Sequence, residues 1–206
     1  MKKIIEECIK INIPYLNYVN NLLLKDINLL SHSKKVTYYS LCILNSISIE
    51  DNLQQYLKLF CSSMLHDLGK INIDDYILQK PSSLTEKEYE IVKTHPCESL
   101  KIMNEFCLEK DISDAILHHH ERYDGKGYPS GLSKENIPIL SRIIAVADAF
   151  DAMTSSRCYR KRPMLKEYAL GELLENAGTQ FDPYITGSFI KLIESGKIHL
   201  GWEFSL

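Results

Sequence analysis

At 206 residues the chain is long enough for one domain with a buried core, or for one domain with a small appendage. Its composition, 45% hydrophobic and 25% charged, is that of an ordinary globular protein and excludes a disordered or collagen-like chain. The formal net charge of −3 argues against a protein that binds polymeric nucleic acid, which normally presents a basic face. A small anionic ligand is still compatible with this charge, because a single site can be positive on an acidic protein.

The cysteines and the first residues indicate a cytoplasmic protein. The six cysteines are spread along the chain without a CxxC pair, which disfavours a zinc ribbon or a disulfide framework. Glu6 and Glu7 interrupt the first apolar run, so we do not expect a signal peptide. The apolar runs are too short to span a bilayer, and we expect no contact with a membrane.

Apolar residues recur at helical spacing along most of the chain, and this pattern predicts an all-α fold. Strand alternation is nearly absent, with one short candidate strand at 198–204. Residues 122–131 are rich in turn formers and are expected to form a loop. Seven helices are predicted. In chain order, the first starts at Pro14, the second after His32, the third covers 53–65, the fourth starts at Thr85, the fifth covers 113–121, the sixth runs from Pro138 to Met153, and the seventh starts after Asp182.

Two of the predicted helix ends lie beside polar residues of interest. Gly69 is expected to end the helix at 53–65, just after His66 and Asp67. The helix that starts at Thr85, where the sequence matches a capping box, is expected to continue to His95. The proline that follows His95 would end or kink this helix.

Histidines and aspartates are concentrated in several short segments. Taken alone, the pair His66 and Asp67 favours a cap or a structural hydrogen bond over a metal site, and His95 is weaker evidence still. The histidine run at 118–120 is stronger evidence, because adjacent imidazoles are costly to bury without a proton or a metal.

Asp148 is the strongest single indication of a site. It shares an apolar stripe of its predicted helix, where a carboxylate must be paired or bound to a metal. An N-cap, a buried ion pair with Arg142 or Arg157, and a metal site all fit this position equally well. Asp151 points towards another face and is expected to make a structural hydrogen bond.

Motifs of several other enzyme classes are missing from the chain. It has no HExxH, no phosphate-binding P-loop, no G-x-S-x-G elbow and no second cysteine of a zinc deaminase. Mixed histidine and aspartate ligands suit Mn, Fe, Zn or Co rather than Mg alone. A carboxylate that bridges two ions about 3.5–4 Å apart is an arrangement used to hydrolyse phosphate esters.

Eight motif segments follow one another along the chain, at 66–71, 80–85, 95–96, 119–129, 138–140, 146–153, 157–160 and 180–183. In residues and order they resemble the HD-GYP family, a branch of the HD-domain metal phosphohydrolases associated with hydrolysis of cyclic di-GMP. The resemblance covers most of the chain and implies a single HD-type helical bundle as the catalytic domain at 26–206. Residues 1–25 would form an N-terminal helical extension that serves packing or the formation of a homodimer.

The resemblance also implies a site with two divalent transition-metal ions, iron or manganese. Asp67 would bridge the two ions, and His118 lies outside the pattern. Some relatives carry a glutamate for a third metal one helical turn before the first histidine, but Asn28 occupies that position here. The implied ligands are His32, His66 and Asp148 for one ion, and His95, His119 and His120 for the other.

The implied reaction is hydrolysis of cyclic di-GMP to linear pGpG, to GMP, or to both, by a hydroxide held between the two ions. Asp67 and Lys70 would be catalytic, and Lys70 would also contact a phosphate. Tyr128, Arg157 and Arg160 match positions near the bound nucleotide. Two alternatives stay open: a phosphodiesterase for another cyclic dinucleotide, and a nucleotide receptor or interaction module of low turnover with the same fold.

Overall fold

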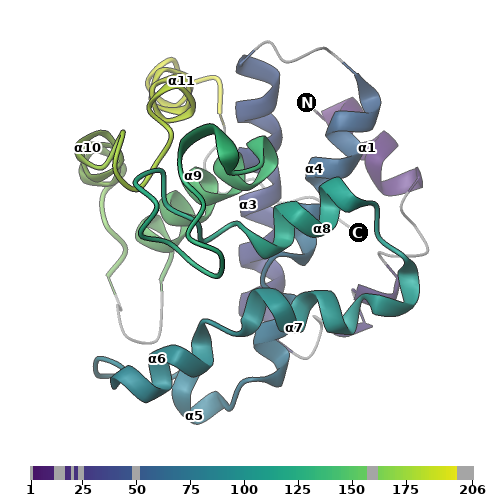
Figure 1. The fold of residues 1–206 in the computed structure, drawn as a ribbon. Helices are drawn as coiled ribbons and strands as arrows, with labels where there is room; N and C mark the ends of the chain where they lie inside the picture. The colour runs from purple at the N-terminus through teal and green to yellow at the C-terminus, as the bar shows by residue number, and fades with distance from the viewer. Residues whose placement is uncertain are drawn as a thin grey trace.

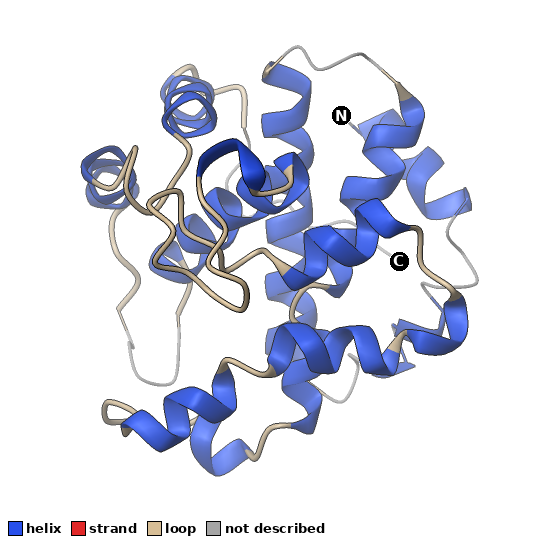
Figure 2. Ribbon diagram, viewed as in Figure 1, coloured by secondary structure: helices blue, strands red, loops and turns tan. Residues whose placement is uncertain are grey.

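The computed structural model describes residues 2–11, 17–19, 21–22, 26–47, 52–156 and 162–198. Within these ranges the regular structure is helical, and the one β-type contact is an isolated bridge between Ala177 and Phe181 (Figure 2). The prediction of an all-α fold is therefore confirmed. Of the candidate strand at 198–204, only Ile198 is described, and it is not in a strand. In the described part of the chain, each helix is too short or too polar to cross a membrane.

The helices are, in chain order, α1 (Lys2–Ile11), α3 (Ile27–Ser46), α4 (Leu53–Leu65), α5 (Asp75–Leu78), α6 (Glu86–Val92), α7 (His95–Ile102), α8 (Lys110–Leu117), α9 (Ile139–Thr154), α10 (Lys166–Glu175) and α11 (Pro183–Glu194). In the described part of the chain, three short 3-10 helices connect them: η1 (Leu68–Asn72), η2 (Asn104–Phe106) and η3 (Lys134–Asn136).

Helix α3 forms the centre of the bundle. It packs against α4, α9 and α11, while α1 and α8 pack on α4 and α10 packs on α9 (Figure 1). The Tyr39 ring of α3 lies 5.4 Å from Phe150 of α9 and 6.0 Å from Phe189 of α11, both edge-on. These aromatic contacts lock three helices together, because buried rings contribute large apolar areas and favour edge-to-face geometry.

The sequence predicted a helix that follows His32, but α3 already begins at Ile27. Its N-cap is Asp26, whose Oδ1 accepts hydrogen bonds from the backbone N–H groups of Asn28 and Leu29. His32 therefore lies inside a helix that is buried on most sides, and its ring cannot turn out to solvent.

Gly69 does not end helix α4 as predicted. It lies in η1 without a positive φ, and a Cβ built on it would be 2.1 Å from the backbone oxygen of His95. Its N–H donates to Ser99 Oγ at 2.8 Å, and that hydroxyl donates to the His66 oxygen. A residue without a side chain is needed here because two backbones meet, and this contact brings His66 close to α7.

The prediction that the helix from Thr85 reaches His95 is wrong. The capping box at Thr85 is present, but α6 ends at Val92 and His95 is the first residue of α7. Pro96 lies in the first turn of α7, where its fixed φ and missing N–H cost nothing. The chain thus turns sharply before His95 and directs its ring into the bundle.

Helix α8 ends at Leu117, so the histidine run at 118–120 follows the helix in a turn rather than lying in it. The loop predicted at 122–131 is confirmed. Buried Glu121 holds this loop by accepting hydrogen bonds from the N–H groups of Ser130 and Leu132. Gly127 lets the loop fold back closely, since a Cβ there would be 2.3 Å from the Arg122 nitrogen.

The helix starts predicted at Pro138 and after Asp182 are confirmed. Pro138 is the N-cap of α9, and Asp182 caps α11 by accepting hydrogen bonds from the N–H groups of Tyr184 and Ile185. The start of the helix predicted at Pro14 lies outside the described residues.

Candidate metal centre

Asp67 lies at the centre of a buried cluster of imidazoles. Its Oδ2 is 3.3 Å from His32 Nε2 and 3.5 Å from His66 Nε2. Its Oδ1 is 3.2 Å from His95 Nε2 and 4.0 Å from His119 Nε2. The two oxygens of one carboxylate therefore face two different sets of imidazoles.

The described residues contain two groups of possible ligand atoms, and both groups include Asp67. Within each group, all the ligand atoms lie within 4.8 Å of one another. One group joins Asp67 to His32 and His66, and the other joins it to the three residues His95, His119 and His120. Asp148 adjoins the first group, since its Oδ1 lies 3.1 Å from His32 Nε2. All seven ligands expected from sequence thus lie together, divided as the resemblance implies.

Residues from five parts of the chain form this cluster. His32 lies in the second turn of α3, the His66–Asp67 pair lies at the junction of α4 and η1, and His95 lies at the start of α7. The turn after α8 contributes His119 and His120, and α9 contributes Asp148. The members other than His120 and Asp148 are buried, and the Asp148 side chain is 18% exposed.

Three of the imidazoles are held by the same local contact. The Nδ1 atom of each lies 2.6–2.7 Å from the backbone carbonyl oxygen three residues earlier. A carbonyl oxygen only accepts hydrogen bonds, so each Nδ1 carries a proton, and in a neutral ring the lone pair is then on Nε2. The pairs are His66 with Ser63, His95 with Val92, and His119 with Ile116.

This protonation leaves several buried acceptors facing one another. His66 Nε2 and Asp67 Oδ1 are buried without a hydrogen-bond donor among the described residues. The Nε2 atoms of His95 and His119, both acceptors, lie 3.3 Å apart. Converging lone pairs in a dry site are costly unless a cation lies between them. The donor set of imidazole nitrogens and carboxylate oxygens fits a divalent transition metal.

Burial keeps three of these histidines in the neutral form that binds metals. It lowers the pKa of His66, and lowers that of His119 well below its ordinary value. The same cause lowers the pKa of His120 to about 3, although Asp148 and Asp67 oppose the change. Neutral imidazole is the metal-binding form because its lone pair is free.

His32 and the two carboxylates beside it behave differently. Burial disfavours a charged His32, but hydrogen bonds with Asp148, Asp151 and Asp67 outweigh it and raise the pKa of His32 to about 10. Burial would likewise raise the pKa of Asp67 and Asp148, yet nearby cations, chiefly Lys70 for Asp67 and His32 for Asp148, hold both well below the ordinary value. Both carboxylates are therefore ionised, and a metal ion that binds His32 would displace the proton from its Nε2 atom.

The contacts of Asp148 and Asp151 test most of the alternatives considered for them. Asp148 lies inside α9 and not at its N-cap, and Arg142 pairs with Asp182 at 2.5 Å. The N-cap and the ion pair with Arg142 are therefore excluded, while Arg157 lies outside the described residues. The structural hydrogen bond expected of Asp151 is confirmed, since its Oδ2 lies 2.6 Å from His32 Nδ1.

Two further residues expected at the site, Lys70 and Tyr128, contact the cluster. Lys70 Nζ lies 2.6 Å from Asp67 Oδ2, and the Tyr128 ring stacks on His120 at 5.0 Å between centroids. Sequence reasoning missed Lys93, whose Nζ lies 5.8 Å from the centre of the Tyr128 ring and 5.4 Å from that of Tyr89. Lys93 is the C-cap of α6, four residues after Tyr89, and this spacing was the available sequence indication.

Arg157 and Arg160, expected near a nucleotide, lie outside the described residues. His118 belongs to neither ligand group, and its Nδ1 lies 3.5 Å from Glu121 Oε1. Cys8, Cys42, Cys61, Cys97 and Cys107 are all free thiols, as expected for a chain without a disulfide framework.

The helical bundle and its central His–Asp cluster define a protein of the HD-domain class. A family model described as HD domain matches residues 18–185, so the chain belongs to the HD-domain family. The identification as a member of its HD-GYP branch, made from the motifs, is confirmed.

Relatives with known names share most of this domain. A cyclic di-GMP phosphodiesterase of Thermotoga maritima is 45% identical over 131 residues, which are 62% of this chain and 35% of the relative. A cyclic di-GMP phosphodiesterase of Pseudomonas aeruginosa is 37% identical over 164 residues, which are 79% of this chain and 38% of the relative. The chain thus spans little more than a third of the length of these relatives.

The fold also matches solved structures. A cyclic GMP-AMP-specific phosphodiesterase of V. cholerae superposes with a TM-score of 0.60 at 19% identity, over 81% of this chain and 44% of that one. At this identity the likeness concerns the fold alone.

Proposed function

We propose that the chain is the catalytic domain of a metal-dependent phosphodiesterase that hydrolyses cyclic di-GMP. The observation that carries this proposal is the division of the cluster into two ligand groups that share Asp67. The names of the two relatives in Thermotoga maritima and Pseudomonas aeruginosa support the substrate. We assign the catalytic domain to 26–206 and an N-terminal extension to 1–25. Helix α1 packs on α4 with Ile5 and Cys8 buried, which favours packing over homodimer formation as the role of this extension.

The proposed cofactors are two divalent transition-metal ions, iron or manganese. His32, His66 and Asp148 would hold one ion, His95, His119 and His120 the other, and Asp67 would contact both. When bound, such ions lower the pKa of a coordinated water and neutralise charge on phosphoryl oxygens. Asn28 is exposed and offers a neutral amide where some relatives carry a carboxylate, so we propose two ions and not three.

Lys70 and Tyr128 are proposed to hold the phosphate of the substrate. The Lys70 side chain is 24% exposed and borders Asp67, so its ammonium can attract an anion to the cluster. Burial raises the pKa of Tyr128, which keeps its phenol protonated and able to donate a hydrogen bond to a phosphate oxygen. Lys93 would add a further positive charge beside Tyr128. Arg157 and Arg160 are assigned to the nucleotide by the resemblance alone.

The test of this proposal is Asp67→Ala against wild type, each loaded with manganese or iron and incubated with several cyclic dinucleotides. We expect wild type to hydrolyse cyclic di-GMP, and the variant to lose hydrolysis by at least 100-fold together with bound metal. Asp111→Ala removes an exposed aspartate that pairs with Lys58 and is the matched control with unchanged activity. Chromatography of the products separates pGpG from GMP.

Two results would contradict the proposal. Unchanged hydrolysis by Asp67→Ala would show that the cluster does not perform the reaction. Binding of cyclic di-GMP by wild type without turnover, in the presence of either metal, would instead indicate a receptor with this fold.

A further inference from the structure

His32 differs from the other imidazoles of the cluster in the partner of its Nδ1 atom. In His66, His95 and His119 this atom donates to a neutral backbone carbonyl. In His32 it lies 2.6 Å from Oδ2 of Asp151, a buried carboxylate one helical turn after Asp148 on α9. His32 and Asp151 are 119 residues apart in the chain, so only the packing of α3 on α9 creates this pair.

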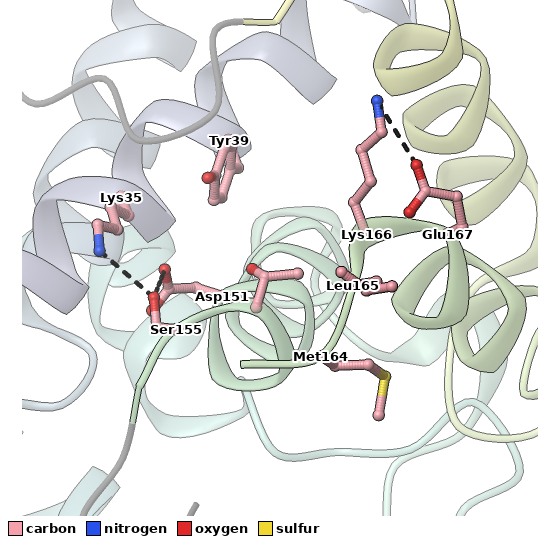
Figure 3. Close-up of a pocket in the computed structure, with 9 residues that line it drawn as sticks. Lys35, Tyr39, Asp151, Ser155, Met164, Leu165, Lys166 and Glu167 are labelled. Atoms are coloured by element: carbon pink, nitrogen blue, oxygen red, sulfur yellow. Dashed lines mark hydrogen bonds and ion pairs between the residues drawn. The ribbon is translucent and has the colours of Figure 1, made fainter. Parts of the chain in front are cut away.

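Asp151 is itself held in place from its other side. Ser155 Oγ donates to Asp151 Oδ1 at 2.8 Å, and Lys35 Nζ donates to Ser155 Oγ at 3.3 Å. Figure 3 shows both contacts, which meet at Ser155 and connect Lys35 of α3 to Asp151 of α9. The same residues line a pocket of about 320 Å³, so the chain of contacts begins at the surface and ends at the cluster. Both carboxylate oxygens are thus engaged, which limits the rotation of Asp151.

A carboxylate partner does two things to an imidazole that ligates a metal. It fixes the proton on Nδ1, so that the lone pair is on Nε2, and it fixes the plane of the ring. A full negative charge at this position also makes Nε2 a stronger donor than a neutral carbonyl does. Here Nε2 of His32 is directed at Asp67 and Asp148, at 3.3 and 3.1 Å.

We infer that Asp151 is a positioning residue, which orients His32 and strengthens it as a ligand for one of the two ions. This inference rests on the proposed function, because it requires the metal centre. It assigns Asp151 to the ion held by His32, His66 and Asp148, and predicts no effect on the ion held by His95, His119 and His120. We expect the two ions to respond differently because the Nδ1 partners differ. Of the four imidazoles compared above, His32 has a carboxylate at Nδ1, whereas His66, His95 and His119 have a backbone carbonyl there.

The test is titration of metal-free protein with manganese, followed by calorimetry and by electron paramagnetic resonance. Asp151→Asn keeps the shape of the side chain and an acceptor oxygen but removes the charge. Loss of such an outer partner typically weakens metal binding by about 10–100-fold. We expect wild type to bind two ions with a spin-coupled signal. In Asp151→Asn one of the two affinities should fall by this factor, and the uncoupled six-line signal of a single ion should appear at intermediate metal.

Asp182→Asn is the matched control. Asp182 is also a buried aspartate that contacts a cation, Arg142, but it caps α11 and does not contact the cluster residues described above. This variant should lose stability and keep both manganese affinities. If Asp151→Asn does not fold, Ser155→Ala removes one of the two supports of Asp151 and should weaken the same ion to a smaller extent.

The outcomes separate the two proposals. Wild type that binds no pair of ions overturns the proposed function. Wild type that binds two ions, together with an Asp151→Asn variant that binds both with unchanged affinity, overturns only the positioning role. Equal weakening of both ions would also overturn it, because it would indicate a general structural effect.

Discussion

At the scale of single residues, local contacts decide which atoms are free for chemistry. The backbone carbonyl oxygens of Ser63, Val92 and Ile116 each accept a hydrogen bond from Nδ1 of the histidine three residues later. A ring fixed in this way keeps its Nε2 lone pair aimed at Asp67 without any long-range partner. The geometry of a short turn therefore orients each of these rings without a contact from a distant residue.

Substitution of Gly69 by alanine is expected to destabilise the fold strongly. A Cβ there would lie 2.1 Å from the His95 oxygen and 2.5 Å from the Ser99 nitrogen, both in the backbone of α7. Backbone atoms cannot move aside as a side chain can, so we expect Gly69→Ala to cost about 1–3 kcal/mol or more in the free energy of unfolding. It should also weaken metal binding, because η1 and α7 are forced apart.

Urea denaturation followed by circular dichroism measures this effect. Gly171→Ala on α10 is the matched control, since a Cβ there meets nothing within 4 Å. That variant should gain about 0.5–1 kcal/mol from the better helix propensity of alanine. Equal stability of the two variants would refute the close approach of η1 and α7.

At the scale of elements, the ends of helices matter more for this site than their lengths. Helix α7 starts at His95, α8 stops before the histidine run, and η1 starts directly after the His66–Asp67 pair. Helix ends expose side chains in directions that a continuous helix cannot offer, because each next residue turns by about 100°. Three ligand segments at helix ends can therefore converge on one carboxylate.

The capping box of α6 gives a prediction for the pH dependence of stability. Glu88 accepts hydrogen bonds from Lys80 and from the Thr85 N–H, and these lower its pKa from 4.5 to about 2. A carboxyl group with a lowered folded pKa stabilises the fold above its unfolded pKa and loses that contribution as the pH falls through the folded one. The contribution of Glu88 is therefore present above about pH 4.5 and disappears towards pH 2.

Thermal denaturation of wild type and Glu88→Gln between pH 2 and 7 checks this expectation. The Tm of wild type should exceed that of the variant above about pH 5, and the difference should close on acidification. Glu86→Gln, in the same turn but outside the capping box, should give no such pH-dependent difference. A difference between wild type and Glu88→Gln that stays constant over the whole range would contradict the shifted pKa.

At the scale of the whole molecule, the His–Asp cluster joins side chains from elements that are far apart in the sequence. Helix α3, the α4–η1 junction, α7, the turn after α8 and α9 each contribute to the cluster around Asp67. Without a cation, buried acceptors such as His66 Nε2 and Asp67 Oδ1 oppose this assembly. Bound metal should therefore stabilise the entire bundle and not one helix.

We expect manganese or iron to raise the Tm of the metal-free protein, and a chelator to reverse the increase. A ligand that binds only the folded state at 100 times its Kd contributes about 2.7 kcal/mol per site. Differential scanning calorimetry at rising metal concentration measures this contribution. Asp67→Ala should show no increase, and an equal increase in that variant would place the metal elsewhere.

The all-α class, most helices and the order of the motifs were predictable from the sequence. Apolar spacing is a local property, and caps such as Asp182 and Thr85 act within one turn, so both can be recognised without a partner. The end of α6 before His95 was not predictable, because the capping box specifies where a helix starts and not where it stops. The role of Gly69 was missed since its neighbours, His95 and Ser99, are far along the chain.

The sequence by itself determined the kinds of residue available for the site, namely the histidines and aspartates in the order of the HD-GYP motifs. Only the tertiary structure decided which of them meet, with Asp67 between two sets of imidazoles and Asp151 behind His32. The physical reason is that residue type and helical period are written along the chain. Contacts between residues as distant as His32 and Asp151 depend on how α3 packs on α9, and no local pattern specifies that packing.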